Sequence, residues 1–398
     1  MTTAVIITIC FLLLLAYVFD ISSPLTKIPS VILLLLLGWV VKQVTYLLEI
    51  PVPDLNPLLP LLGTFGLILI VLEGALELEL DESKIPIIKK STLIALITMI
   101  TLAVILAVAF QFFGHVSFKT GLINANPFCV ISSAIAIPSA RNLSSSDKEF
   151  VIYESSLSDI LGVLFFNFIV LNEYINGQSF GHFLFQIIIV VLISLVSVLG
   201  LSFLLSRIKH HITYTPIILL VILIYAITKV YHLPGLIFIL VFGLFLGNVE
   251  KLKQISWIGR FYTGKLSTEV AKFKGITIEA TFLIRALFFI LFGFLMEVSE
   301  ILNLETMPYA VAIVLAVGVV RWIALKISKI PFAPLLYIAP RGLITILLFL
   351  AIIPEHSIPF VNKALVIQTI ILSVLAMMGG LMRSQKKELS AQIPTVET

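Results

Sequence analysis

The sequence predicts an all-α protein that crosses a membrane many times. Hydrophobic side chains make up 60% of its 398 residues and charged side chains only 12%, which is far from the balance of a soluble globular domain. Apolar stretches of roughly 17 to 25 residues recur along the whole chain, and each is long enough to cross about 30 Å of hydrocarbon as a helix. No sizeable water-soluble segment remains between them, so lipid is the expected solvent.

The first half of the chain contains six predicted spans. They cover residues 4–19, 30–47, 58–78, 92–113, 121–140 and 150–171. The first apolar run has no basic leader and no small-residue cleavage site after it, so we expect a span there rather than a cleaved signal peptide.

The second half adds seven predicted spans. They cover residues 182–205, 212–230, 235–249, 276–296, 308–326, 335–353 and 360–381. The total of about thirteen is odd, which predicts that the two termini lie on opposite sides of the membrane.

The distribution of basic residues predicts the orientation. Lys and Arg gather in alternate loops, such as 84–90 and 251–274, and in the carboxyl-terminal tail, whereas the loop at 297–305 is acidic. Basic loops face the cytoplasm. We therefore expect a multi-pass protein of the inner or plasma membrane with its N-terminus outside, a transmembrane domain over 1–382 and a short cytoplasmic tail over 383–398.

Ionisable residues in the middle of spans are the strongest functional signal. A charge at the bilayer centre costs at least about 3 kcal/mol, so it should face a cavity or a partner. These residues are Glu73, Glu154, Asp159, Arg285, Arg321 and Arg341.

Asp159 lies halfway along the sixth span. Ser155 precedes it by four residues, so both side chains project from one helix face and can offer oxygen atoms to a hard monovalent cation. Glu154 is rotated away by about 140° and is better placed to pair with an arginine. A proton or a partly dehydrated cation can neutralise the buried Asp159 carboxylate, which predicts competition between the two.

Two spans contain helix-breaking residues. Pro127 follows Asn126 in the fifth span, and Pro340 lies in the twelfth; proline removes a donor and disfavours helical geometry in the residue before it. Interrupted helices in corresponding positions indicate an inverted-repeat transporter, in which they cross at the midplane. Free carbonyls at such a break, such as that of Ala125, can coordinate a cation, and Arg341 can balance the negative helix ends.

Other functional classes receive less support from the sequence. Cys10 and Cys129 lie in apolar segments, which excludes a disulfide framework. We expect no enzyme and no cofactor, because no nucleophile has a base at suitable spacing. We expect no nucleic-acid partner, because the basic residues are concentrated in loops, as membrane orientation requires. Two rival classes stay open: a cation channel whose acids line a continuous pore, and an inverted-repeat symporter of organic anions.

The segment from Glu154 to Asp159 resembles the Glu-Ser-x-x-Asn-Asp signature of monovalent cation/proton antiporters, the sodium/proton exchanger superfamily. Residues 28–38 and 62–78 are similar to the family's second and third spans, and residues 288–293 to its late phenylalanine-rich span. Its buried arginine and its Pro-Arg-Gly turn also have counterparts, at Arg321 and at residues 340–342. The resemblance covers nearly the whole membrane domain and implies the sodium/proton antiporter fold.

The resemblance implies a role for each matching position. Asp159 would bind cation and proton in competition, Glu154 would pair with Arg321, and Arg341 would stabilise the crossed helices. Two positions depart from the pattern.

The first departure is Asn126 with Pro127, where many members have Thr-Asp-Pro, and the second is Ser158, where they have Asn or Asp. Each change removes a ligand charge or amide. Glu73 could supply the oxygen that Asn126 keeps only as an amide.

The resemblance also implies a transport mode. Members with one aspartate at this place tend to be electroneutral, so we expect one-for-one exchange of H⁺ for a cation, Na⁺ before Li⁺ or K⁺. Alternating access would move core helices, over 92–171 and 308–381, against a scaffold that forms a homodimer.

Overall fold

The computed structural model describes residues 2–26, 28–78, 82–172, 177–207, 215–230, 235–252 and 264–392. Within these ranges every regular element is a helix, and ten helices are long and apolar enough to span a membrane. Two shorter apolar helices, Ile217–Thr228 and Gly235–Gly247, fall inside the eighth and ninth predicted spans. The prediction of an all-α polytopic membrane protein is therefore confirmed.

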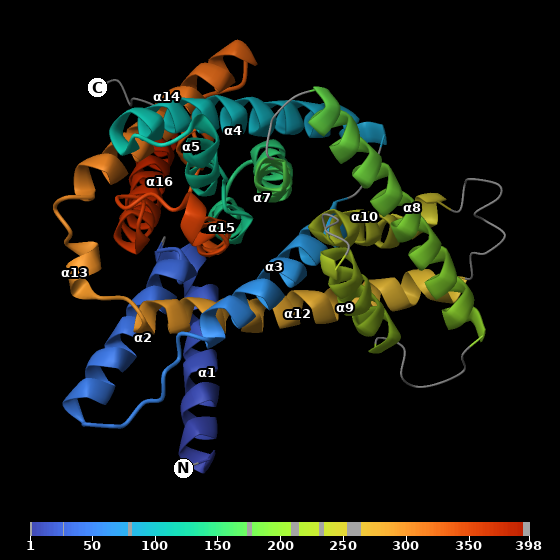
Figure 1. The fold of residues 1–398 in the computed structure, drawn as a ribbon, viewed down its shortest axis with the longest axis horizontal. Helices are drawn as coiled ribbons and strands as arrows, with labels where there is room; N and C mark the ends of the chain where they lie inside the picture. The colour runs from blue at the N-terminus through green and yellow to red at the C-terminus, as the bar shows by residue number, and fades with distance from the viewer. Residues whose placement is uncertain are drawn as a thin grey trace, which may run out of the picture. The chain divides into compact units, whose positions relative to one another are not determined.

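The chain forms two compact units, and α3 (Leu58–Glu77), α7 (Ser145–Leu171) and α12 (Gly264–Phe294) contribute residues to both, as does α4 (Ile85–Gly114), whose first two residues belong to unit 2. Unit 1 comprises Met1–Leu61, Ile87–Gly162 and Ala286–Thr398. Its other helices are α1 (Thr2–Thr26), α2 (Ser30–Leu47), α5 (Phe118–Ala125), η2 (Asn126–Phe128), α6 (Ser133–Ser139), α13 (Val298–Ile301), α14 (Met307–Ile327), η4 (Leu335–Tyr337), α15 (Leu343–Leu350), η5 (Pro354–His356) and α16 (Lys363–Gln392) (Figure 1).

Unit 2 comprises Leu62–Pro86 and Val163–Arg285. Besides the shared helices it contains η1 (Glu82–Lys84), α8 (Gly177–Arg207), α9 (Thr215–Val230), α10 (Gly235–Gly247) and α11 (Val249–Leu252). Helix α10 packs against α8 and α9. It also lies close to α3, because a Cβ at Gly243 would stand 2.7 Å from the Cβ of Ala75.

Close backbone approach joins α2 and α12 within unit 1. A Cβ at Gly38 would overlap the Ile290 carbonyl oxygen, and one at Gly293 would overlap the Leu35 carbonyl oxygen. Small residues at such points let two membrane helices pack backbone to backbone. The last helix, α16, continues to Gln392, so residues 383–392 of the predicted tail are helical, while 393–398 lie outside the described residues.

Two of the predicted spans are interrupted, as the proline positions predict. Helix α5 ends at Ala125, a single 3₁₀ turn holds Asn126 and Pro127, and α6 begins only at Ser133. The twelfth predicted span is not one helix, because residues 338–342 are non-helical between η4 and α15. Proline at 127 and 340 explains both interruptions, since it cannot donate to an i−4 carbonyl.

The two non-helical segments meet directly. The Ser132 amide donates to the Pro340 carbonyl at 2.9 Å, and α15 packs against η2 (Figure 1). Gly342 allows this approach: a Cβ there would lie 2.6 Å from Ser132 Oγ and 2.8 Å from Ile135 Cδ1. The polar backbone of one break therefore helps to satisfy that of the other, as a bilayer requires.

A buried ion pair links the helices that frame this crossing. Glu154 on α7 is 1% exposed and Arg321 on α14 is 2% exposed. The guanidinium donates to both carboxylate oxygens, at 2.6 and 2.8 Å, and its Nε donates to the Leu335 carbonyl at 2.8 Å. Such a bidentate geometry compensates the loss of water around both charges.

Replacing Glu154 with Gln should destabilise the protein by about 3–5 kcal/mol, because Arg321 would remain charged and buried without its counter-ion. Thermal unfolding of the purified protein in detergent measures this loss. The matched control is Glu269→Gln, which breaks the exposed 3.1 Å pair with Lys272 and should cost less than about 1 kcal/mol. Equal unfolding midpoints for the two variants would contradict the assignment.

Replacing Gly342 with Ala should cost about 1–3 kcal/mol, because the new methyl group would overlap Ser132 and Ile135 at the crossing. The control is Gly318→Ala in α14, where an added Cβ meets nothing within 4 Å and should stabilise the helix by about 0.5–1 kcal/mol. Unfolding midpoints in detergent separate the two. A Gly342→Ala protein as stable as the control would show that the crossing tolerates a side chain.

Candidate functional site

Asp159 is buried in unit 1 beside the first helix break, and it is 3% exposed. One carboxylate oxygen, Oδ2, accepts two hydrogen bonds from Ser133: one from the amide at 3.1 Å and one from the hydroxyl at 2.5 Å. The other oxygen, Oδ1, is buried and has no hydrogen-bond partner among the described residues. Ser133 is the first residue of α6, so the break itself delivers these donors to Asp159.

Neighbouring residues of α7 bind the same break on either side of Asp159. Ser158 Oγ accepts the Ile131 amide at 2.9 Å. One turn further along, the Gly162 carbonyl accepts Asn126 Nδ2 at 2.8 Å. These bonds satisfy backbone groups that the interruption of the helix leaves without partners.

The Asn126 side chain is fully buried, and its orientation follows from its partner. Because Nδ2 donates to Gly162, the amide oxygen Oδ1 faces away from that bond, and it has no donor within the described part of the chain. Asn126 is therefore bound to α7 at Gly162, three residues after Asp159, and its neutral amide oxygen stays available. An unpaired buried oxygen is costly unless something positive approaches it.

Ser155 and Ala125 already have partners. The Ser155 hydroxyl donates to the Val151 carbonyl of its own helix at 2.7 Å. The Ala125 carbonyl accepts Cys129 Sγ at 3.2 Å. Each oxygen keeps a second lone pair, so these contacts leave their predicted roles as cation ligands untested.

Glu73 belongs to unit 2, whereas Asp159 belongs to unit 1. In unit 2, Glu73 lies near Thr281 and interacts electrostatically with Arg285. Arg285, which the sequence leaves without a role, is thus a charged neighbour of Glu73. The predicted part of Glu73 in cation binding stays a prediction.

Arg341 lies in the second break and is 2% exposed. Its Nε donates to the Phe128 carbonyl at 2.5 Å and its Nη1 to the Ala339 carbonyl at 3.0 Å, while its amide donates to Ser373 Oγ at 3.0 Å. The Arg341 guanidinium therefore binds carbonyls from both interrupted helices. This is the electrostatic balance expected at the carboxyl ends of helices.

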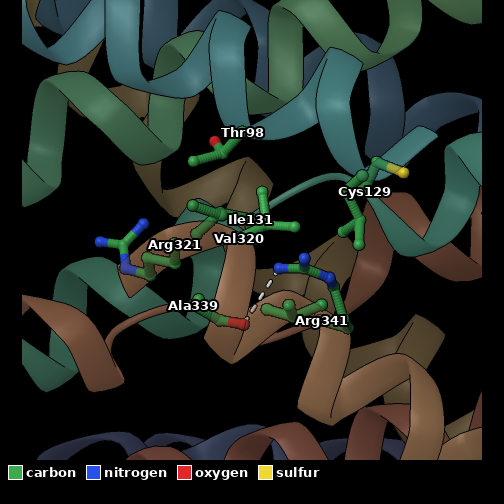
Figure 2. A pocket seen from close by; sticks show the side chains of 9 residues that line it. Thr98, Cys129, Ile131, Val320, Arg321, Ala339 and Arg341 are labelled. Carbon is green, nitrogen blue, oxygen red and sulfur yellow. Dashed lines mark hydrogen bonds between the residues drawn. The ribbon is translucent and has the colours of Figure 1, made fainter. Parts of the chain in front are cut away.

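Figure 2 shows a small cavity between these charged groups, lined by Arg321, Arg341, Cys129 and Thr98 among others. The Arg341 side chain turns toward the Ala339 carbonyl, and Arg321 lies on the other side of Ala339 in this view. The cavity measures about 10 Å³, which is room for a single water molecule. The arginines are thus packed as parts of the core.

Sequence reasoning did not single out Ser133. The sequence does mark this position as a helix start, because Ser132 and Ser133 follow the break at Pro127 and serine is favoured where a helix begins. What the sequence could not indicate is that the hydroxyl would bind a side chain on α7 rather than its own helix.

The arrangement is suited to a small cation. Asp159 Oδ1 and Asn126 Oδ1 are two of the four buried side-chain oxygens that have no hydrogen-bond partner among the described residues, and hard cations take carboxylate and amide oxygens as ligands. A proton on Asp159 Oδ1 would neutralise the same group. The geometry therefore provides one buried carboxylate that either species can occupy.

Comparisons with known proteins agree with this fold. The structure of the sodium proton antiporter MjNhaP1 from Methanocaldococcus jannaschii at pH 8 has a TM-score of 0.73 with 19% identity, over 97% of this chain and 99% of that one. A 3D EM map of the same antiporter gives 0.65 with 18% identity, over 100% and 99%. These likenesses establish the fold alone. No curated protein matches the chain.

The family model described as sodium/hydrogen exchanger, transmembrane, matches residues 9–382. This match spans nearly the whole chain and confirms the resemblance seen at residues 154–159. The protein therefore belongs to the sodium/hydrogen exchanger family, and it is a multi-pass membrane cation/proton antiporter rather than an enzyme.

Proposed function

We propose that the protein exchanges Na⁺ for H⁺ by competition at Asp159. The observation that carries this proposal is the Asp159 Oδ1 atom, which is buried and receives no hydrogen bond from any described residue. Asn126 Oδ1 supplies a second oxygen to the bound ion. The name of the family favours Na⁺, and Li⁺ and K⁺ are the alternatives, because ligand number and cavity size decide among them.

The mechanism depends on the cost of a bare charge in the membrane. An ionised Asp159 alone is unfavourable in a low-dielectric core, whereas a carboxylate that holds a proton or a cation is neutral. The binding site therefore changes its access from one side of the membrane to the other only when a proton or a cation occupies it. Alternating access of the core helices, over 92–171 and 308–381, against a scaffold then couples the two fluxes.

Ser155, Ser158, the Ala125 carbonyl and Glu73 are the further oxygen ligands that we propose. Ser155 and Ser158 lie on α7 one turn and one residue before Asp159, and both are buried. Ala125 lies directly before the break. Each oxygen has a partner already, so ion binding would add to its hydrogen bond or replace it.

We infer a one-for-one, electroneutral stoichiometry. Asn126 and Ser158 are neutral, and Glu154 is paired with Arg321 at 2.6 Å. An arginine stays protonated at any relevant pH, so Arg321 carries no proton across. Glu73 interacts electrostatically with Arg285, which also stays protonated, so we infer that Glu73 keeps its charge. Asp159 is then the one group of the proposed site whose charge changes in the cycle.

The protein is proposed to act as a homodimer in the inner or plasma membrane, with its N-terminus outside and its C-terminus in the cytoplasm. The basic loops support this orientation. The exposed apolar residues of α1, such as Ile7, Phe11 and Leu14, would face lipid or a second copy of the chain.

Replacing Asp159 with Asn should abolish cation-dependent proton flux, because the side chain could no longer exchange a proton for a cation. Dye-quench assays on everted vesicles measure it, with Na⁺, Li⁺ and K⁺ added in turn. The control, Asp54→Asn, makes the same change in an exposed loop and should retain wild-type exchange. Flux in Asp159→Asn equal to that of the control would refute the site, and wild-type flux without counter-transport would indicate a channel.

Exchange in proteoliposomes should be insensitive to an imposed membrane potential, because no net charge crosses in a one-for-one cycle. A single unbalanced charge would be driven by about 2.3 kcal/mol per 100 mV. The measurement compares initial Na⁺ uptake driven by a fixed pH gradient, with and without a valinomycin-imposed K⁺ potential. A rate that follows the potential would overturn the stoichiometry while leaving the exchange itself in place.

A further inference from the structure

Ser133 makes two contacts with the proposed site and has no role in the function described so far. Its amide and its hydroxyl both donate to the same oxygen of Asp159, at 3.1 and 2.5 Å. It begins α6, immediately after the segment 130–132 that crosses the second break. A serine hydroxyl has one hydrogen to donate, so a serine that donated to a carbonyl of its own helix could not also donate to a carboxylate on another helix.

We propose that the Ser133 hydroxyl is a positioning group that sets the balance between proton and cation at Asp159. This inference rests on the proposed exchange at Asp159. The Ser133 hydroxyl holds Asp159 Oδ2 and leaves Oδ1 as the atom that meets the incoming ion. It therefore determines the orientation of the carboxylate and the preference of Asp159 between a proton and a cation.

The physical reason is that the Ser133 hydrogen bond differs in strength between the two states of Asp159. A hydrogen bond to an ionised carboxylate is stronger than one to a neutral carboxyl group. The cation-bound state keeps the carboxylate ionised, whereas the proton-bound state does not. The hydroxyl therefore favours the cation-bound state, and its removal favours the proton-bound state.

No other described group offers Asp159 a comparable contact. Besides Asp159, the buried titratable and charged side chains among the described residues of unit 1 are Tyr153, Glu154, Arg321, Arg341 and Cys129. Glu154 and Arg321 bind each other, Arg341 donates to backbone carbonyls, and the Cys129 thiol donates to Ala125. Both hydrogen bonds that the structure gives to Asp159 therefore come from Ser133.

The backbone bond and the side-chain bond can be separated by mutation. Ser133→Ala removes the hydroxyl and leaves the amide donor, and Ser133→Thr keeps both. Ser139→Ala is the matched control: it makes the same change on the same helix, where the hydroxyl donates to the Ile135 carbonyl at 2.7 Å and not to Asp159.

Exchange is measured in proteoliposomes over a range of pH and Na⁺ concentration. Ser133→Ala should shift the pH profile about one unit toward alkaline pH, the size expected for one hydrogen bond to a charged group. Its apparent KM for Na⁺ should rise about tenfold on the acidic side of the profile and change little at alkaline pH, where protons no longer compete. Ser133→Thr and Ser139→Ala should keep the wild-type profile.

Two outcomes would overturn the inference. One is a Ser133→Ala profile that coincides with that of Ser139→Ala. The other is a Ser133→Thr profile shifted as far as that of Ser133→Ala, since a retained hydroxyl should retain the balance. Should Ser133→Ala fail to insert, Ser133→Cys takes its place, because a thiol is a much weaker donor than a hydroxyl and should shift the profile in the same direction. An unshifted Ser133→Cys profile would then overturn the inference.

The parallel Asp159→Asn measurement separates this inference from the function beneath it. Inactive Asp159→Asn with an unshifted Ser133→Ala profile refutes the role of Ser133 alone. Active Asp159→Asn refutes the proposed exchange site itself.

Discussion

The backbone of two interrupted helices imposes the main requirement on unit 1. Each interruption leaves amides and carbonyls unpaired inside a region that lipid surrounds, where every unsatisfied group is costly. The structure meets this requirement with specific partners: Ser158 accepts the Ile131 amide, Asn126 donates to Gly162, and Arg341 donates to the carbonyls of Phe128 and Ala339. Polar side chains in the core are therefore needed for folding before any ion binds.

The same solution places a carboxylate where it can act. Because α7 must stay close to the first break to satisfy it, Asp159 is held against the start of α6, where Ser133 binds one of its oxygens. The second oxygen has no donor in the part of the chain that the structure describes. One oxygen of the carboxylate is thus fully hydrogen-bonded, while the other is available to a proton or a cation. The hydrogen bonds that stabilise the fold also orient the Asp159 carboxylate.

Charge is divided between two roles in this core. Glu154 and Arg321 neutralise each other through a bidentate pair, and Arg341 is bound by carbonyls. The two arginines stay charged, and their contacts hold the surrounding helices together. In the proposed cycle, Asp159 alone gains and loses charge, so a change of occupancy need not disturb the charges that support the crossing.

The sequence alone determined the all-α membrane class, the two interruptions and the family, because apolar length and proline act locally. The pairing of Glu154 with an arginine also followed from helix periodicity. Tertiary structure decided the rest. Ser133 lies 26 residues from Asp159 in the chain and became its partner only when the break folded against α7. The packing of the first break against α7 also decided that the Asn126 amide nitrogen donates to the Gly162 carbonyl, while its oxygen has no donor within the described part of the chain, since side-chain orientation depends on partners that no local pattern specifies.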